Sequence, residues 1–378
     1  MSVQVIRVVV LIALCCACSR AAAAQEIYVA NFGDGDVSVL DAVTMAPLAR
    51  IPVTGVADPA IPIDGYPSAV VFSADHKLAF VALSLAQHVA VIDTTTRKVV
   101  SYIDVQAVSF DALVFLHPSG HKVYVTSCEN ATISVIDVST RTMTGTIALP
   151  SGSYPMAFSP NGRTAYVGNG YADCGAVNGI YRVSLSTSKT SGFIPTSGPV
   201  SDVAISPDDS LALASGTNRV LVVDVATSTE TGAVMCGVTP CTYLYSGGLA
   251  FNATGTRAYV IDFEGNTLST INTDRSSAMF LQEMSRVPVF AEPGQNAWQV
   301  AVRQDRAIVA VMGFPGHVIS FDISGDVPVA ISLDPVGTYA YEFDIWTLPT
   351  SEAGCKNLGW TALGGYKNQG NCLNFAGN

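Results

Sequence analysis

The chain is poor in charge, and poorest in positive charge. Charged residues make up 13% of its 378 residues, and 19 Lys and Arg stand against 30 Asp and Glu, for a formal net charge of −11. Nucleic acids and anionic membrane surfaces attract clustered Lys and Arg, so this balance argues against both as partners. We expect a partner that is a protein or part of the cell envelope, and a chain that is itself a monomer.

Long apolar runs are absent beyond residue 24, so no membrane-spanning helix is predicted, because such a helix needs about 20 apolar residues. The first 24 residues have the pattern of a signal peptide. Arg7 supplies the positive charge, residues 8–18 are apolar, and Ala22–Ala24 fit the small-residue cleavage rule. We expect a secreted, periplasmic or cell-surface protein that begins at Gln25. The alternatives are an uncleaved anchor and a lipoprotein modified at a cysteine of this segment.

Histidine is also scarce, with five residues in the whole chain. They are scattered among different parts of the sequence, and none lies in an H-E-x-x-H or C-x-x-C-H motif. A G-x-S-x-G motif and a phosphate-binding loop are missing as well. These absences argue against a copper- or haem-binding subunit of a periplasmic redox enzyme.

Six of the nine cysteines lie beyond the predicted signal peptide: Cys128, Cys174, Cys236, Cys241, Cys355 and Cys372. An even set in an exported protein indicates disulfides. Closeness in sequence suggests the pairs Cys236–Cys241 and Cys355–Cys372, which leaves Cys128 with Cys174, although sequence alone does not choose among the pairings. Zinc binding is the competing interpretation, and the lack of paired C-x-x-C knuckles disfavours it.

One pattern recurs along the chain. The segments IYVANFGDGDVSVLD (27–41), KVYVTSCENATISVID (122–137) and AYVIDFEGNTLSTIN (258–272) are variants of it. Seven copies align on an aromatic residue or its substitute: Tyr28, Phe80, Tyr124, Tyr166, Leu213, Tyr259 and Val309. A period in the forties is typical of repeat architectures.

Each copy reads as four short antiparallel strands with no helical periodicity. An apolar run is followed by a turn such as SPNGR (159–163), a strand with the aromatic residue, a polar loop, and an alternating strand. That strand ends at Asp93, Asp137, Asp224 or Asp322, where the side chain can bond the next backbone N–H groups. A last strand completes the unit. The sequence therefore predicts an all-β, seven-bladed β-propeller, with a linear β-solenoid as the alternative.

The two ends of the repeat region are predicted to pair. The first copy begins at Ile27, already at its second strand, and an extra strand-like run appears at 338–346. We expect this run to complete the first blade and so to remove a free sheet edge. The predicted organisation is a signal peptide at 1–24, a propeller at 25–348 and a separate tail at 349–378.

The YVAN, YVTS and YVGN segments and the VSVID-like strands resemble the YVTN-type (YncE-like) β-propeller repeat. The resemblance covers about 27–346 and implies an exported or surface-layer protein of bacterial type. It implies little about activity, because related propellers serve as lactonases, dehydrogenase subunits and adhesive modules. The YVTN core itself is a packing motif.

The tail CKNLGWTALGGYKNQGNC (355–372) resembles a short cysteine-bracketed module found at the ends of exported bacterial proteins. It departs from that pattern at Leu358 and Tyr366. A disulfide between its ends would stabilise so small a loop. The tail is interpreted either as a contact module with Trp360 as an exposed anchor, or as a segment packed on the propeller.

Ligand sites in propellers gather where loops converge over the central channel. The polar residues predicted to begin innermost strands are Asp111, Asp202, Gln299 and Glu342. Their carboxylates could hold Ca²⁺, or they could line the channel and cap strands. In NFGDGD (31–36), Asp34 and Asp36 lack the further acids of a calcium loop, so an ordinary hairpin turn is favoured.

These features favour an exported, non-catalytic scaffold or binding module without a cofactor. The alternative is a lactonase-like, metal-dependent hydrolase or lyase with its site in the channel. Such an enzyme would depend on Asp111, Asp202 and Glu342 for its metal or its acid–base groups.

Overall fold

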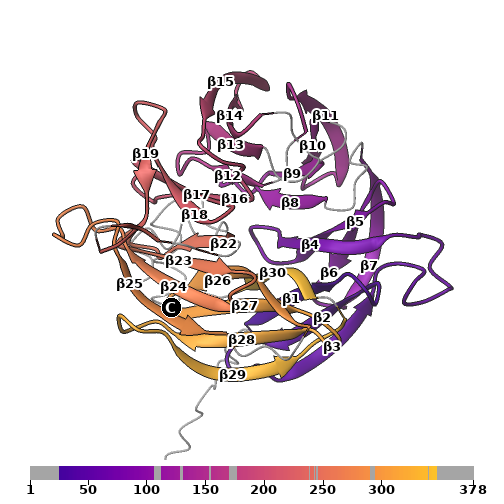
Figure 1. Ribbon diagram of the computed structural model, residues 1–378. Helices are drawn as coiled ribbons and strands as arrows, with labels where there is room; N and C mark the ends of the chain where they lie inside the picture. Colours follow the sequence, from indigo (N-terminus) through magenta and orange to yellow (C-terminus); the bar gives the residue numbers. More distant parts are fainter. Residues whose placement is uncertain are drawn as a thin grey trace, which may run out of the picture.

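The computed structural model describes residues 25–105, 112–127, 131–152, 155–169, 177–237, 239–241, 243, 246–289, 294–338 and 340–346. Within these ranges the chain is all β. Seven four-stranded antiparallel sheets are arranged around a central axis as the blades of a propeller (Figure 1). The predicted fold is confirmed. Because these described residues contain no helix, none of them forms a helix that could cross a membrane.

The blades follow the chain in order, and the strands of each blade run from the innermost to the outermost. Blade 1 contains β30 (Ala340–Trp346), β1 (Glu26–Asn31), β2 (Asp36–Asp41) and β3 (Pro47–Pro52). Blade 2 contains β4 (Tyr66–Phe72), β5 (Leu78–Ser84), β6 (His88–Asp93) and β7 (Lys98–Asp104). Blade 3 contains β8 (Leu113–Leu116), β9 (Lys122–Ser127), β10 (Thr132–Asp137) and β11 (Thr142–Ala148).

Blade 4 contains β12 (Met156–Phe158), β13 (Thr164–Asn169), β14 (Gly179–Ser184) and β15 (Lys189–Pro195). Blade 5 contains β16 (Asp202–Ile205), β17 (Leu211–Gly216), β18 (Arg219–Asp224) and β19 (Thr229–Ala233). Blade 6 contains β22 (Ser246–Phe251), β23 (Arg257–Asp262), β24 (Thr267–Asn272) and β25 (Glu283–Pro288). Blade 7 contains β26 (Asn296–Arg303), β27 (Arg306–Met312), β28 (His317–Asp322) and β29 (Val329–Pro335). A short hairpin of β20 (Met235–Cys236) and β21 (Thr239–Pro240) follows blade 5.

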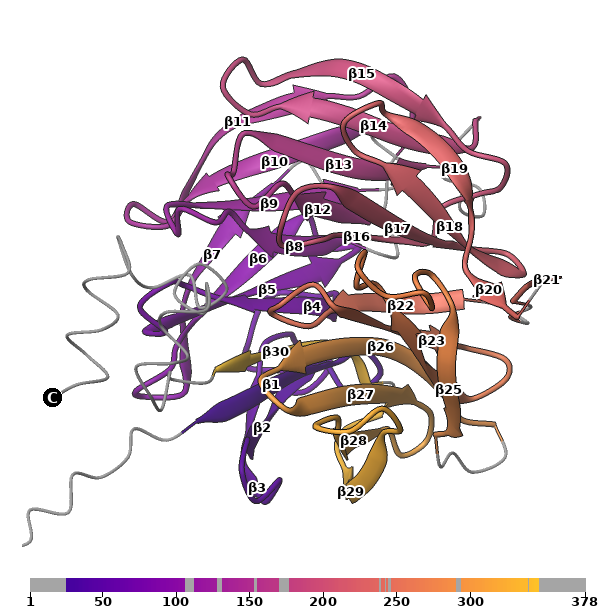
Figure 2. The same ribbon diagram turned by 90° about the vertical axis from the view of Figure 1, so that its left-hand side faces the viewer.

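The ring closes as the sequence predicted. The last strand, β30, pairs antiparallel with β1, with Glu26 opposite Trp346 and Val29 opposite Phe343. Figure 2 shows these strands, from opposite ends of the colour scale, side by side. Pairing the two ends of the chain covers an edge that would otherwise be open to other strands.

The NFGDGD segment reinforces the closure. Asp34 accepts hydrogen bonds from the backbone and hydroxyl of Thr338, which precedes β30. Arg50 of β3 makes ion pairs with both Asp34 and Asp36. Asn31 accepts a hydrogen bond from the backbone N–H of Gly337 at 3.1 Å. Asp34 and Asn31 therefore join the first and last segments of the propeller, and Asp36 is bonded within blade 1.

The residue that marks each repeat is a core residue. Tyr28, Phe80, Leu213 and Val309 are completely buried, and the other three marker residues are at most 3% exposed. They belong to apolar clusters that fill the spaces within and between blades. Burying a side chain of this size contributes about 1.5–3 kcal/mol. The recurring motif therefore specifies packing.

Two faces of the propeller follow from the strand order. Because the strands of a blade alternate in direction, the connections from second to third strand and from one blade to the next lie at one end, which we call the loop face. The connections from first to second and from third to fourth strand lie at the other end, which we call the turn face. Each blade therefore contributes connections of one kind to the loop face and of the other kind to the turn face.

Candidate functional site

The loop face has connections of unequal length. The segments between blades range from 53–65, which joins blades 1 and 2, to 336–339, which joins blades 7 and 1. Those between second and third strands range from the two residues 217–218 to 170–178. Variable connections on a regular scaffold are where binding residues concentrate.

Aromatic side chains occupy matching places on this face. Phe32, directly after β1, stacks on Tyr66 at the start of β4, with ring centroids 4.8 Å apart. Phe263, directly after β23, meets Trp298 near the start of β26 edge-on at 5.5 Å. All four are partly exposed. Between β27 and β28, Phe314 is 68% exposed.

A groove of about 430 Å³ lies on the outer side of blades 1 and 2. Ile61 and Pro62 of the 53–65 connection line one wall, and Val100 and Tyr102 of β7 line the other. The charged lining residues are Asp58, Arg97 and Lys98. Of these, Arg97 is held by the buried Glu26 at 2.6 Å. The groove is therefore mostly apolar, with charge at its edge.

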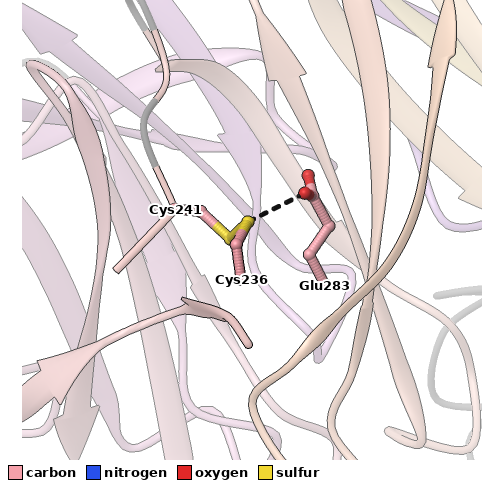
Figure 3. Close-up of side chains that lie close together, drawn as sticks. All are labelled: Cys236, Cys241 and Glu283. Carbon is pink, nitrogen blue, oxygen red and sulfur yellow. Dashed lines mark hydrogen bonds between the residues drawn. A yellow bond between two sulfur atoms is a disulfide. The ribbon is translucent and has the colours of Figure 1, made fainter. Parts of the chain in front are cut away.

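The β20–β21 hairpin contains the one disulfide among the described residues, Cys236–Cys241. Its sulfurs lie against Glu283, the first residue of β25 in the next blade (Figure 3). This pairing is the one that closeness in sequence predicts. Cys128, Cys174, Cys355 and Cys372 lie outside the described residues, and so does Trp360.

Asp202 begins β16, the innermost strand of blade 5. One carboxylate oxygen accepts the N–H of Val203, and the other accepts the N–H of Leu249 on the innermost strand of blade 6, both at 2.8 Å. Burial raises the pKa of Asp202 to about 7, against the lowering effect of these two bonds. The carboxylate therefore joins two neighbouring strand edges at the channel.

Other polar side chains on innermost strands also accept backbone N–H groups. Asp344 of β30 accepts the N–H of Phe72 in blade 2 at 2.9 Å. The amide oxygen of Gln299 accepts the N–H of Val300 at 2.8 Å, and its side chain lies so close to Gly248 that a Cβ there would collide with it. Asp202 thus caps the N–H groups of two inner strands, and Gln299 caps an N–H group of its own strand.

The three predicted ligand residues that lie in described strands come from different blades. Asp202 belongs to blade 5, Gln299 to blade 7 and Glu342 to blade 1. Asp111 lies outside the described residues, as does the side chain of Glu342. Among the side chains that the structure describes, one group of His, Cys, Asp or Glu is close enough to share a metal ion, namely Cys236, Cys241 and Glu283. The sequence did not indicate Glu283, because it is distant in the chain and belongs to another blade.

The same turn length recurs in five blades on the turn face. The connections from first to second strand at 73–77, 117–121, 159–163, 206–210 and 252–256 are all five residues long. After the third strand, the carboxylate of Asp93 accepts the N–H of Thr96 at 2.7 Å, and that of Asp137 accepts the N–H of Thr140 at 2.9 Å. The bond from Thr96 lowers the pKa of Asp93, and bonds from the Ser139 hydroxyl and then the Thr140 N–H lower the pKa of Asp137. The turn predicted after Asp is confirmed.

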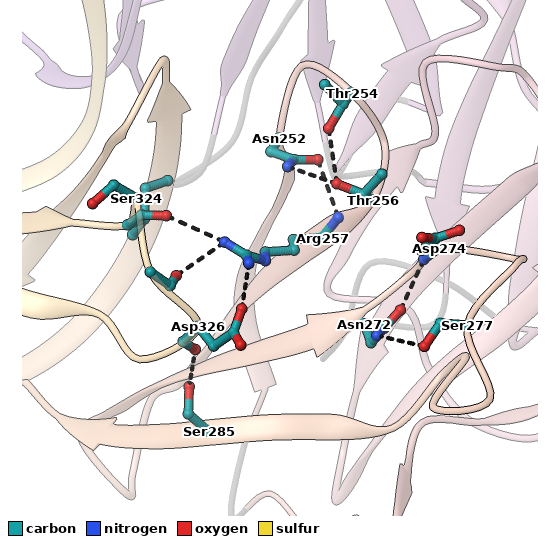
Figure 4. A network of polar contacts seen from close by, with 12 residues as sticks. Asn252, Thr254, Thr256, Arg257, Asn272, Asp274, Ser277, Ser285, Ser324 and Asp326 are labelled. Carbon is teal, nitrogen blue, oxygen red and sulfur yellow. Dashed lines mark hydrogen bonds and ion pairs between the residues drawn. The ribbon is translucent and has the colours of Figure 1, made fainter.

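Neighbouring blades are joined across the turn face. Arg257, directly after the 252–256 turn of blade 6, donates to the carbonyl of Gly325 at 2.9 Å and forms an ion pair with Asp326 of blade 7 (Figure 4). The backbone carbonyl of Asp326 accepts a hydrogen bond from Ser285 at 2.8 Å. Polar groups of this face thus also hold blades 6 and 7 together.

Comparison with known proteins identifies the fold. No family model matches the chain, and no curated protein matches it. Among solved structures, a functionally unknown protein from Desulfotomaculum acetoxidans is similar with a TM-score of 0.66 and 16% identity, over 85% of this chain and 99% of that one. Hydrazine synthase of Kuenenia stuttgartiensis is similar with a TM-score of 0.61 and 18% identity, over 74% and 89%.

A third similar structure is the dihydro-heme d1 dehydrogenase NirN, with a TM-score of 0.55 and 15% identity, over 84% of this chain and 74% of that one. The chain is a seven-bladed β-propeller. At these identities the likeness extends to the fold and not to activity, since propellers of one architecture carry unrelated functions.

Proposed function

We propose that this chain is an exported propeller of the YVTN type that binds a protein or cell-envelope partner through its loop face, without catalysing a reaction. The observation that carries the proposal is the contrast between the faces. Five first-to-second-strand connections of the turn face have one length, although the connections 304–305 and 273–282 of that face depart from it, whereas the loop face pairs aromatic side chains across neighbouring blades and exposes Phe314.

The aromatic residues of the loop face support a protein partner. Aromatic side chains are enriched at the centres of protein interfaces, because they bury a large area with few rotatable bonds. The Phe32–Tyr66 and Phe263–Trp298 pairs are held in place by ring contacts, and Phe314 is exposed. A ligand could cover these groups with little ordering cost.

Site-specific photo-crosslinking in intact producing cells tests the proposal. A benzophenone amino acid at Phe314 should give a crosslinked protein adduct of one defined mass. The same group at Thr95, an exposed position on the turn face, is the matched control and should give none. Equal adducts from both positions, or none from Phe314 in cells that retain the protein, would contradict a loop-face interaction.

A lactonase-like hydrolase or lyase is the second candidate, and the raised pKa of Asp202 favours it. A carboxyl group that titrates near neutral pH suits general acid–base catalysis. This candidate predicts tightly bound Ca²⁺ in the purified protein and hydrolysis of simple lactones, both lost in Asp202→Asn. Protein with neither property, and unchanged by the substitution, would leave the binding module as the better account.

A further inference from the structure

The cluster around the β20–β21 disulfide has the composition of a metal site. One ligand atom each from Cys236, Cys241 and Glu283 lies within 4.8 Å of the others. Cys241 is buried and Glu283 is partly buried. Once the disulfide is reduced and the sulfurs separate, two sulfurs and a carboxylate oxygen in this arrangement could contact one ion of zinc size, since Zn–S and Zn–O bonds are about 2.0–2.3 Å long.

The local sequence presents both sulfurs from one hairpin. Cys236 and Cys241 have C-x4-C spacing, which lies within the range of zinc-ligand pairs. The turn between them contains Gly237 with φ of 71°, a conformation that glycine adopts at no steric cost. Although the disulfide forms in the structure, the hairpin spacing alone does not require one.

The third ligand is brought in by contacts between blades. The N–H of Met235 donates to the carbonyl of Leu281 at 2.9 Å, and the N–H of Gly237 donates to the side chain of Gln282 at 3.0 Å. These two contacts fix the hairpin against the residues directly before Glu283. The carboxylate is thus positioned by backbone and side-chain bonds that do not depend on the disulfide.

The carboxylate is also oriented and partly neutralised. Arg286 donates from Nε to Oε1 of Glu283 at 2.9 Å, which leaves Oε2 directed at Sγ of Cys236, 3.0 Å away. The guanidinium of Arg286 lies over the ring of Tyr243 at 4.6 Å and 3.8 Å from Asp262. Ligating carboxylates are commonly hydrogen-bonded through their other oxygen in this way. The guanidinium offsets part of the negative charge of two thiolates and a carboxylate.

We infer that reduction of the Cys236–Cys241 disulfide turns this cluster into a binding site for Zn²⁺, with two thiolates and Glu283 as ligands and water in the remaining position. A dithiol reductant supplies two electrons and two protons, so the disulfide becomes two thiols and the reductant becomes a disulfide. Zn²⁺ then displaces both thiol protons. The oxidised protein does not bind the ion here, because its sulfurs are bonded to each other.

Protection from alkylation locates the site without relying on an activity. The full mature chain is reduced with a phosphine, the phosphine is removed under anaerobic conditions, and Zn²⁺ is added at buffered free concentrations. Iodoacetamide labelling followed by peptide mapping then reports each cysteine separately. We expect Zn²⁺ to slow the labelling of Cys236 and Cys241 together, at least about tenfold, and we expect a chelator to restore normal labelling.

Two variants distinguish a built site from casual thiol binding. Glu283→Gln should need at least about tenfold more free Zn²⁺ for half-protection, because it removes a ligand and its charge. Glu264→Gln, on an exposed connection of the same blade, is the control and should behave as the parent. Circular dichroism confirms that each reduced protein keeps its β structure. Unprotected cysteines at saturating Zn²⁺, or equal protection in Glu283→Gln and the parent, would overturn the inference.

Discussion

The two faces of the propeller are made from the same repeat but differ in how regularly their connections recur. On the turn face, Asp93 and Asp137 hold backbone N–H groups of the next residues, and Arg257 bridges to the neighbouring blade. On the loop face, the connections differ from blade to blade, and aromatic and aliphatic side chains are exposed.

The difference indicates a division of tasks. A turn that recurs with the same bonds in several blades is constrained by folding, since each loss leaves backbone donors less well satisfied. A connection that varies among copies of one repeat is not under that constraint and is available for binding. The turn face is therefore expected to govern stability and the loop face to govern recognition, which stability measurements can test directly.

The largest effect is expected from the turn face. Replacing Asp41, Asp93 and Asp137 together by Ala should lower the free energy of unfolding by about 3 kcal/mol, because a side-chain cap of backbone N–H groups contributes about 1 kcal/mol. Each of these aspartates accepts such N–H groups in the structure. Urea unfolding at pH 7 measures the change.

The matched control is a triple loop-face variant in which Val56, Val177 and Phe314 become Ser. These side chains are 46–68% exposed, so their replacement should cost less than about 1 kcal/mol in total. Equal losses in the two triple variants would mean that the faces do not differ in their contribution to stability.

Next in size is the covalent link beside the loop face. Replacing both Cys236 and Cys241 by Ala should lower the free energy of unfolding by about 2 kcal/mol, the entropy of closing so short a loop in the unfolded chain. The parent protein measured with a thiol reductant provides the comparison for this pair. A loss as large as that of the triple aspartate variant would show that this link, and not the turn face, dominates.

A third contrast lies between aspartates of the two faces, whose pKa values move in opposite directions. Hydrogen bonds from Thr96 lower the pKa of Asp93, so its contribution is present above about pH 4 and is lost as pH falls. Burial raises the pKa of Asp202 to about 7, so its contribution is present at low pH and is lost as pH rises from about 4 to 7.

Comparing the free energy of unfolding of the parent and of Asp202→Asn at pH 5 and pH 7.5 isolates the contribution of the Asp202 carboxyl. The parent should gain about 1.5 kcal/mol relative to the variant at the lower pH, after allowance for partial exposure of the carboxyl. Burial lowers the pKa of His76 to about 4, which has the opposite sign but is common to both proteins and cancels. A constant difference between the proteins over this range would contradict the raised pKa.

Local sequence accounts for the repeat, the closing strand and the turns, because each depends on residues near one another or on a period along the chain. Contacts between blades were not predictable in the same way. Glu283 approaches Cys236, and Leu249 approaches Asp202, only because the twist and spacing of adjacent sheets bring them together. The place of Asp202 at the start of an innermost strand was predictable, but its partner on the next blade was not.

The smallest expected change in stability concerns the fourth residue of the five-residue turns on the turn face. In the five-residue turns, the fourth residue has positive φ: it is Gly120, Gly162 or Gly255 in three turns, His76 with φ of 56° in blade 2, and Asp209 with φ of 59° in blade 5. A residue other than glycine is strained in this region. Oδ1 of Asp209 is buried without a hydrogen-bond partner, and burial is the main cause of the raised pKa of Asp209.

Asp209→Gly should therefore raise the free energy of unfolding by about 0.5–1 kcal/mol, since relief of strain and of the unpaired Oδ1 exceeds both the loss of the 3.4 Å hydrogen bond from Asn161 to Oδ2 and the added freedom of glycine in the unfolded chain. The reverse change, Gly162→Ala, should destabilise by more than this, because φ is 67° and the new Cβ would lie 2.9 Å from the His117 ring. Thermal and urea unfolding measure both variants. If Asp209→Gly were destabilising, the hydrogen bond that Asn161 of blade 4 donates to Asp209 would outweigh the relief of strain, and the turn face would depend on side-chain contacts between blades as well as on backbone conformation.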